Sequence, residues 1–215
     1  MKKLNKFISI IIALSLLCLS GCSESKSDKK VYNDKYNPQK AVAYSYKYAK
    51  ERNPEYANFE ANCTNYISQI LVAGGKQMDT PNPPEKDTRI IYDDDTTKWY
   101  STYIETNPER WKEFSVSTAF CRTDDFVEYW TKTRGMKLTK YVNSFDGLIK
   151  LYSKAKVGDI IVLYSADDDI IHLCFLAVKE NKKLLVNANT NDYKDRNILN
   201  IPSESYPKIG LLQMK

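Results

Sequence analysis

Cys63 is the residue of the sequence best suited to nucleophilic chemistry. It starts a segment, Cys63 to Ala73, whose apolar residues recur at helical spacing and which is followed by Gly74 and Gly75. A helix N-terminus stabilises a thiolate, because its unpaired amides and the positive end of its dipole favour negative charge. A free cysteine has a pKa of about 8.5, so a basic partner is its usual complement. The sequence therefore predicts an activated thiol at a helix start.

His172 is the only histidine in the chain and hence the only imidazole available to Cys63. It lies near the start of an apolar run, Ile170 to Val178, that has the composition of a strand. Strand alternation places His172 on the same face as Cys174 and opposite Leu173. One histidine excludes a histidine-rich zinc site, and we expect no metal and no cofactor. The alternative interpretation is a buried structural histidine.

A catalytic imidazole also needs a polar group that fixes its orientation. The next predicted strand, Lys183 to Ala188, is rich in asparagine at its end: Asn187 and Asn189 share a face, and Asn191 follows. A short hairpin would bring this strand beside the strand of His172. We therefore expect one of these asparagines next to the imidazole, and the residues alone do not select one.

The order of the predicted elements indicates the fold class. Helices are expected first and an antiparallel sheet afterwards, which is the pattern of an α+β domain. The expected helices run from Pro38, capped by Asn37, to about Arg52, and over 63–73, 124–133 and 145–153; the expected strands cover 159–164, 170–178, 183–188 and 209–214. Residues 76–95 are interpreted as a surface loop, and residues 96–121 as short aromatic segments that pack over the core or line a cleft.

The N-terminus has the features of a secretory signal peptide. Three lysines precede an apolar run that ends at Leu19-Ser20-Gly21-Cys22. This ending resembles the bacterial lipobox, in which the cysteine is lipidated and becomes the mature N-terminus. We therefore expect residues 1–21 to be a signal peptide, 22–35 a lipidated N-terminus (Cys22) with a flexible tether, and 36–215 one folded domain. The expected location is the outer face of a bacterial membrane.

Charge and cysteine content restrict the function further. Outside residues 1–21 the chain has 29 basic and 27 acidic residues and no basic cluster interleaved with aromatics, so nucleic acid is not an expected partner. Beyond Cys22 three cysteines remain, and this odd number argues against a disulfide framework. Cys121 and Cys174 could form a bridge or be two buried thiols.

The segment Asn62-Cys63-Thr64-Asn65-Tyr66-Ile67-Ser68-Gln69, followed by Ala73-Gly74-Gly75, resembles the signature of the "Putative amidase domain" family. This family is a branch of the papain-like cysteine hydrolases found in bacterial surface and secreted proteins. Residues from Tyr36 to Tyr44 resemble its opening helix, and Ile171-His172 resembles the start of its histidine strand. The resemblance covers about Tyr36 to the C-terminus. It implies a papain-like fold in which Cys63 is the nucleophile and His172 the base.

The sequence departs from the family pattern at one place. Asn189-Thr190-Asn191-Asp192 stands where the family is expected to have a histidine followed by threonine. Cys-His-Asn is a working arrangement in papain-like enzymes, so we expect Asn189 to be the third member, with Asn187 as the alternative.

These residues lead to a hypothesis of acyl transfer. The backbone amide of Cys63 and the side chain of Asn62 are the candidate oxyanion donors. The expected substrate is an amide bond in a peptide or a peptidoglycan-like polymer, because of the expected extracellular location. Two alternatives remain: a surface binding module without turnover, and an acyltransferase that uses the same cysteine and histidine.

Overall fold

The computed structural model describes residue 32 and residues 34–82, 90–104 and 113–215. Almost all of them belong to one compact unit, Asn33–Lys215. The predicted signal peptide, Cys22 and Trp111 lie outside the described residues. Among those that are described, no helix combines the length and apolar character needed to cross a membrane.

Nine strands and seven helical segments follow one another along the described residues. In chain order they are α1 (Pro38–Tyr48), α2 (Cys63–Ala73), β1 (Ile90–Asp93), β2 (Ser101–Ile104), β3 (Glu113–Ser117), α3 (Thr118–Cys121), α4 (Thr123–Glu128), the π-helix η1 (Tyr129–Thr133), β4 (Lys137–Val142), α5 (Phe145–Lys154), β5 (Ile160–Tyr164), β6 (Ile170–Glu180), β7 (Lys183–Ala188), β8 (Tyr193–Asn197), the 3-10 helix η2 (Ile198–Asn200) and β9 (Lys208–Gln213).

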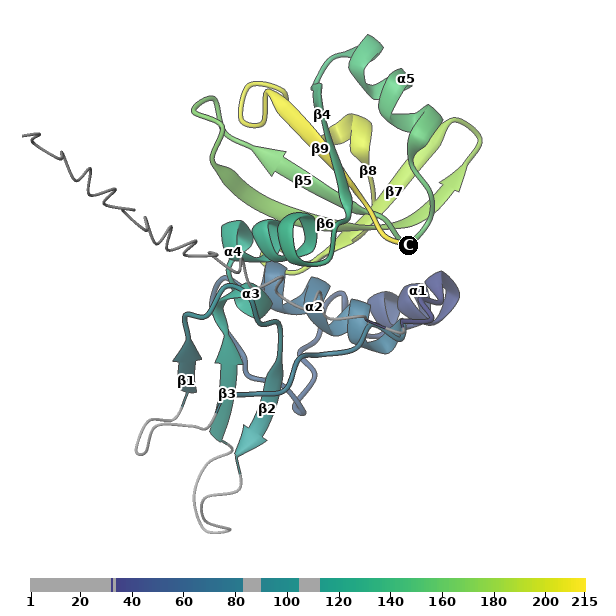
Figure 1. Ribbon diagram of the computed structural model, residues 1–215. Coiled ribbons are helices and arrows are strands. Elements are labelled where there is room, and N and C mark those ends of the chain that lie inside the picture. The colour runs from purple at the N-terminus through teal and green to yellow at the C-terminus, as the bar shows by residue number, and fades with distance from the viewer. Residues whose placement is uncertain (1–31, 33, 83–89, 105–112) are drawn as a thin grey trace, which may run out of the picture. The chain divides into compact units, whose positions relative to one another are not determined.

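The C-terminal half forms a six-stranded antiparallel sheet with the order β4-β9-β5-β6-β7-β8. Figure 1 shows this sheet above α1 to α4, with α5 on its other side. Long helices come before the sheet in the chain, so the predicted α+β class is confirmed. The four predicted strands correspond to β5, β6, β7 and β9.

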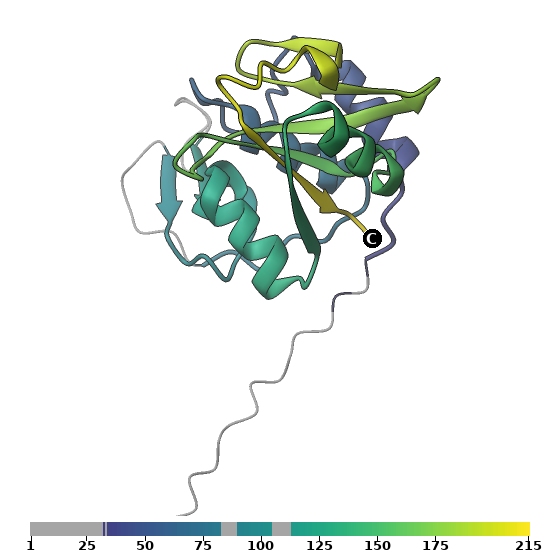
Figure 2. The ribbon, with the colours of Figure 1, turned by 90° about the horizontal axis from the view of Figure 1, so that it is seen from above.

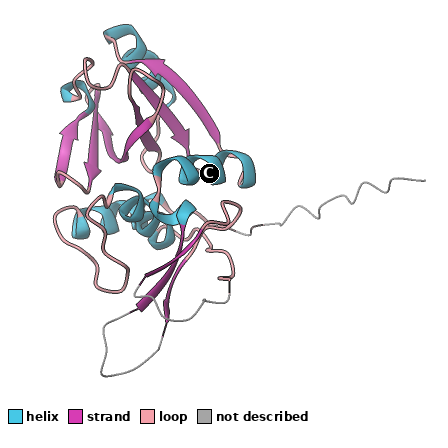
Figure 3. Ribbon diagram, turned by 90° about the vertical axis from the view of Figure 1, so that its left-hand side faces the viewer, coloured by secondary structure: helices cyan, strands magenta, loops and turns pink. Residues whose placement is uncertain are grey.

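Both faces of the sheet are covered by apolar cores, and the side chains of β6 point alternately into one core and the other. Leu173 and Phe175 belong to a core shared with α1 to α4, whereas Cys174 and Leu176 belong to a second core on the side of α5 and η2. Figures 2 and 3 show the helices on the two faces of the sheet. β6 is therefore central, and its odd- and even-numbered residues meet different partners.

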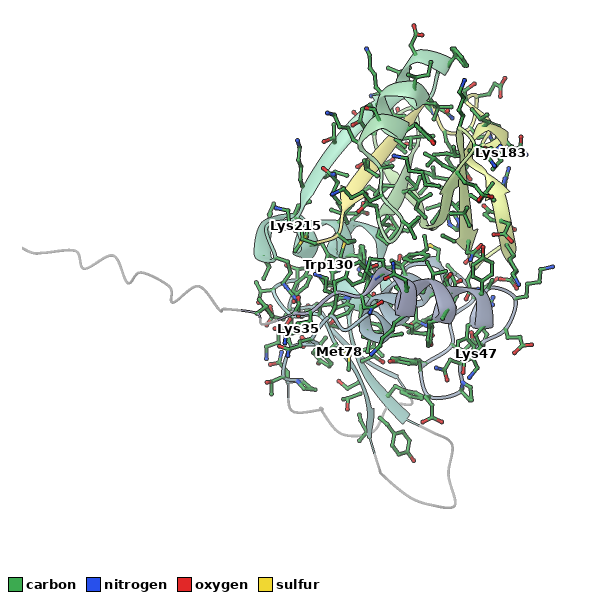
Figure 4. All side chains as sticks on the ribbon, turned by 90° about the vertical axis from the view of Figure 1, so that its right-hand side faces the viewer. Lys35, Lys47, Met78, Trp130, Lys183 and Lys215 are labelled. Carbon is green, nitrogen blue, oxygen red and sulfur yellow. The ribbon has the colours of Figure 1, made fainter. Side chains whose placement is uncertain are left out.

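Two large aromatic residues lie in the core. Trp99 and Trp130 are fully buried, and their ring centroids are 5.1 Å apart in an edge-on arrangement. Figure 4 shows Trp130 in the interior between the six-stranded sheet and the helices, whereas Lys183 lies at the outer end of the β6–β7 hairpin. Aromatic pairs in this geometry stabilise a core beyond the area they bury.

A second sheet, with the order β1-β3-β2, was not predicted. The interpretation of residues 76–95 as a loop is wrong at Ile90–Asp93, which pairs in parallel with β3. β2 and β3 likewise replace part of the predicted irregular aromatic segments. These strands are only four or five residues long, so their identity depends on pairing rather than on a local pattern.

Other differences are smaller. The first helix ends at Tyr48 rather than near Arg52, α4 continues as a π-helix, and strands β4 and β8 were not predicted. Helix α2 has the predicted limits, and α5 ends one residue later than expected. Cys121 and Cys174 are both free thiols, which settles the question of a bridge between them.

Candidate active site

Helix α2 carries Cys63 at its first position and is held in place by its apolar face. Ile67, Ile70 and Leu71 are fully buried in the core beneath the sheet. The helix ends where Gly74 donates to Ile70 O, and Gly75 follows with a φ of 98° that suits glycine. Cys63 is 6% exposed, and its Sγ atom lies 3.8 Å from Thr64 Oγ1.

Asn62, which precedes the thiol, is hydrogen-bonded at every polar position. Its backbone N donates to Thr190 Oγ1 at 2.7 Å, and its carbonyl accepts from Tyr66 N at 2.9 Å. Its side-chain Nδ2 donates to Asn189 Oδ1, and its Oδ1 accepts from Asn65 Nδ2, both at 2.8 Å. Asn62 is only 2% exposed, so these bonds hold it inside the protein.

This network changes what Asn62 does for its helix. Asparagine at the N-cap position normally accepts from a first-turn amide. The side chain of Asn62 makes no such bond, because its oxygen accepts from Asn65 instead. The amides of the first turn of α2 are therefore left without a side-chain cap beside the thiol. Such amides and the helix dipole favour an anion at this end.

His172 lies on β6 opposite Leu163 of β5 and is 7% exposed. Its Nε2 atom is buried and has no hydrogen-bond partner. Burial, and then the positive charge of Arg196, lower the pKa of His172 to about 4. The Tyr193 ring of β8 stands edge-on to the imidazole, with centroids 6.2 Å apart. The imidazole is therefore neutral at pH 7.

His172 and Cys63 are not brought together in the structure. Helix α2 packs against the core that contains Leu173 and Phe175 of β6, whereas Cys174 belongs to the core on the opposite side of the sheet. Burial raises the pKa of the Cys174 thiol. His172 is the preceding residue on the same face of β6, about 7 Å along the strand. The structure contains no hydrogen bond between Cys63 and His172.

The asparagines at the end of β7 lie on the other face of the sheet. Asn187 pairs with Phe175, and its side chain donates to Ser45 Oγ on α1 at 3.0 Å. Asn189 donates to the carbonyl oxygens of Tyr48 and Ala49 at 3.1 and 2.8 Å. The structure therefore brings Asn189 to Asn62 and to the end of α1, and neither asparagine is hydrogen-bonded to His172.

Three residues of this region were not among the candidates. Tyr193 and Arg196 surround His172, and Thr190 holds the backbone of Asn62. Tyr193 and Arg196 belong to β8, a polar strand whose sequence YKDRN has no apolar alternation. The sequence of β8 gave no indication that this segment is a strand beside His172, because its residues do not alternate between apolar and polar.

Metal ligation has no support in the described ranges. Across residues 34–82, 90–104 and 113–215, no three histidine, cysteine or acidic side chains are grouped so that they could hold a metal ion. The chemistry of the region is that of a thiol, an imidazole and amides.

Comparison with known proteins identifies the family of the chain. The model of the "Putative amidase domain" family matches residues 35–210, and the chain belongs to this family. The "Uncharacterized protein YhbB" of Bacillus subtilis (strain 168) is 43% identical over 58 residues, which are 26% of this chain and 19% of that protein. The match thus spans about a fifth of the relative's length. No solved structure matches the chain. The family description indicates an amidase-like hydrolase.

Proposed function

We propose that this protein is a cysteine amidase in which Cys63 attacks the carbonyl carbon of an amide and His172 transfers the protons. The observation that carries the proposal is the position of Cys63 at the first turn of α2, where the Asn62 side chain is diverted and leaves the amides uncapped. An uncapped first turn stabilises both a thiolate and the oxyanion that forms during attack. Family membership supports the choice of an amide substrate.

The proposed reaction has two steps, acylation of Cys63 and hydrolysis of the acyl-enzyme. His172 Nε2 accepts the thiol proton as the Cys63 sulfur bonds to the carbonyl carbon. The tetrahedral intermediate then collapses, the carbon–nitrogen bond breaks, and the imidazolium returns the proton to the leaving amine. Water attacks the resulting thioester with His172 again as base, which releases the carboxylic acid and the thiol.

The oxyanion requires donors aimed at the attacked carbonyl oxygen. In this proposal the backbone amide of Cys63 supplies one donor. Asn62 acts through its position, because its Nδ2 atom is already engaged with Asn189. Asn189 in turn supports Asn62 and the end of α1 rather than the imidazole. The proposal requires His172 to approach the thiol when substrate binds, because the structure places the imidazole on the face of β6 that Cys174 shares.

The finer parts of the proposal concern place and substrate. We propose a papain-like arrangement, with the thiol helix packed against the antiparallel sheet, and a lipid anchor at Cys22 that holds the domain outside the cell. The substrate would then be an amide of a peptide or of a peptidoglycan-like polymer. The support is the lipobox resemblance of Leu19 to Cys22 and the apolar run before it.

The test uses the purified full chain and soluble fragments of peptidoglycan, with amine release as the readout. The proposal expects release by the unmodified protein, loss of release in Cys63→Ala, and unchanged release in the matched control Cys121→Ala. Binding without release would identify a binding module instead. Capture of the acyl group by an added amine, with little hydrolysis, would identify an acyltransferase.

A further inference from the structure

The turn between β7 and β8 contains a residue in an unfavourable backbone conformation. Thr190 and Asn191 have φ values of 61° and 68°. Two successive left-handed residues are what a type I′ hairpin turn requires, and Asn-Gly is the usual pair. Threonine is branched at Cβ and rarely adopts this conformation. A glycine or asparagine would fit position 190 with less strain.

The hydroxyl of Thr190 makes a contact that glycine could not make. Thr190 Oγ1 accepts from Asn62 N at 2.7 Å, across 128 residues of sequence. Asn189 of the same turn also binds this residue, because its Oδ1 accepts from Asn62 Nδ2 at 2.8 Å. Asp192 Oδ1 lies 3.0 Å from Nη2 of Arg52, which follows α1. The turn therefore fastens the chain immediately before α2 to the six-stranded sheet.

This turn reaches both halves of the candidate site. On one side it fixes Asn62, whose carbonyl accepts the first hydrogen bond of α2 from Tyr66. On the other side it leads directly into β8, where Tyr193 stands against the ring of His172. The turn therefore contacts the residue before Cys63 and directly precedes the strand that contacts His172.

We propose that Thr190 is a positioning residue: its hydroxyl holds Asn62 so that the first-turn amides of α2 stay directed at Cys63. The role rests on the proposed function, because it matters only if Cys63 is reactive. Thr190 does not touch the substrate. Its strained conformation is retained because the hydroxyl is needed at this point, which distinguishes the position from an ordinary turn.

The test compares four full-length proteins: unmodified, Thr190→Gly, Thr190→Ser and Asn191→Gly. The rate of Cys63 alkylation by iodoacetamide is followed from pH 5 to 10 by site-resolved mass spectrometry, together with the melting temperature. For Thr190→Gly we expect a melting temperature lower by a few degrees at most, because relief of the left-handed strain partly offsets the lost hydrogen bond, together with alkylation at pH 7 slower by roughly fivefold and a pH profile displaced upward. Thr190→Ser keeps the hydroxyl and should stay within about twofold of the unmodified rate.

Asn191→Gly is the matched control, because it relaxes the neighbouring left-handed residue and should leave the rate and the profile unchanged. Equal rates for the unmodified protein and Thr190→Gly overturn the proposal, and so does a Thr190→Ser variant that behaves like Thr190→Gly. Loss of cooperative melting in Thr190→Gly also overturns it, because the hydroxyl would then be required for folding. If Cys63 of the unmodified chain reacts no faster than in the denatured chain, the proposed function and the role of Thr190 fall together.

Discussion

The N-termini of α2 and α5 begin after residues of the same capping class and are completed differently. At α5, Ser144 Oγ accepts from Gly147 N at 3.3 Å, and α1 is similarly capped where Asn37 Oδ1 accepts from Lys40 N at 3.0 Å. At α2, Asn62 Oδ1 accepts from the side chain of Asn65. Only α2 of these three helices begins with a thiol. Two helix starts have a side-chain cap, and the third has none.

The difference shows that a capping residue is defined by its surroundings as well as by its type. A side-chain cap contributes about 1 kcal/mol to stability. Asn62 forgoes that bond and is stabilised instead by Asn189 and Thr190, which are distant in sequence. Residues that follow strand β7 therefore hold the residue before α2 in place. Four substitutions test the comparison between the helix starts.

The largest effect is expected from replacing the nucleophile. Cys63→Ala should lower amide hydrolysis by at least about 10³-fold, because no other group supplies the covalent step. The melting temperature should change little, since Cys63 lies at the edge of the core rather than within either apolar cluster. Amine release and thermal melting measure the two quantities. Residual activity close to that of the unmodified protein would remove Cys63 from the mechanism.

His172 should make the protein sensitive to mild acid. Its pKa in the folded protein is about 4, below the usual value of 6.5, so the unfolded chain binds the proton more tightly. The free energy of unfolding should therefore fall as the pH drops from about 6.5 to 4, by up to about 3 kcal/mol. Urea unfolding of the unmodified protein and of His172→Gln at several pH values measures this contribution.

The His172→Gln variant should lack that part of the acid sensitivity and should also lose hydrolysis. Carboxylates with lowered pKa values, such as that of Asp95, are present in both proteins and account for the acid loss they share. Identical pH dependence in the two proteins would contradict a buried neutral imidazole. A His172 pKa above 6.5, measured by NMR, would instead indicate an ion pair with the thiolate.

The hydrogen bonds of Asn62 should contribute more to the free energy of unfolding than an ordinary helix cap does. Asn62→Ala leaves Asn189 Oδ1 without its donor in a buried place, so we expect a loss of about 2 kcal/mol in the free energy of unfolding and slower alkylation of Cys63. Chemical denaturation and thiol labelling of the same samples provide the measurement. A variant as stable and as reactive as the unmodified protein would show that the network has no function.

The smallest effect is expected at α5. Ser144→Ala removes a conventional cap, and the free energy of unfolding should fall by about 1 kcal/mol. Alkylation of Cys63 should be unaffected, because α5, the helix that Ser144 caps, packs against the core on the other side of the sheet from α2. The same two assays apply. A slower reaction of Cys63 in Ser144→Ala would mean that labelling reports on global stability rather than on the local amides.

The parts of the fold that the sequence predicts are those with a local signal. Helix α2 has an apolar stripe and a double-glycine end, so both of its limits were predicted, and the apolar run of β6 predicted its start but not its last two residues. The three-stranded sheet was not, because Ile90–Asp93 becomes a strand only by pairing with β3. Cys63 and His172 were selected by residue type, and their roles stay predictions. The diversion of Asn62 depends on Asn189, which is 127 residues away, and no local pattern encodes it.

The most direct test of the central claim is the rate of Cys63 alkylation in the intact chain, compared with Cys121 in the same molecule and with Cys63 in denaturant. Burial raises the pKa of Cys121 to about 12, so this thiol should react very slowly. The account predicts that Cys63 at pH 7 reacts faster in the folded than in the denatured chain. A folded rate equal to or below the denatured rate would contradict the claim that the uncapped start of α2 activates the thiol.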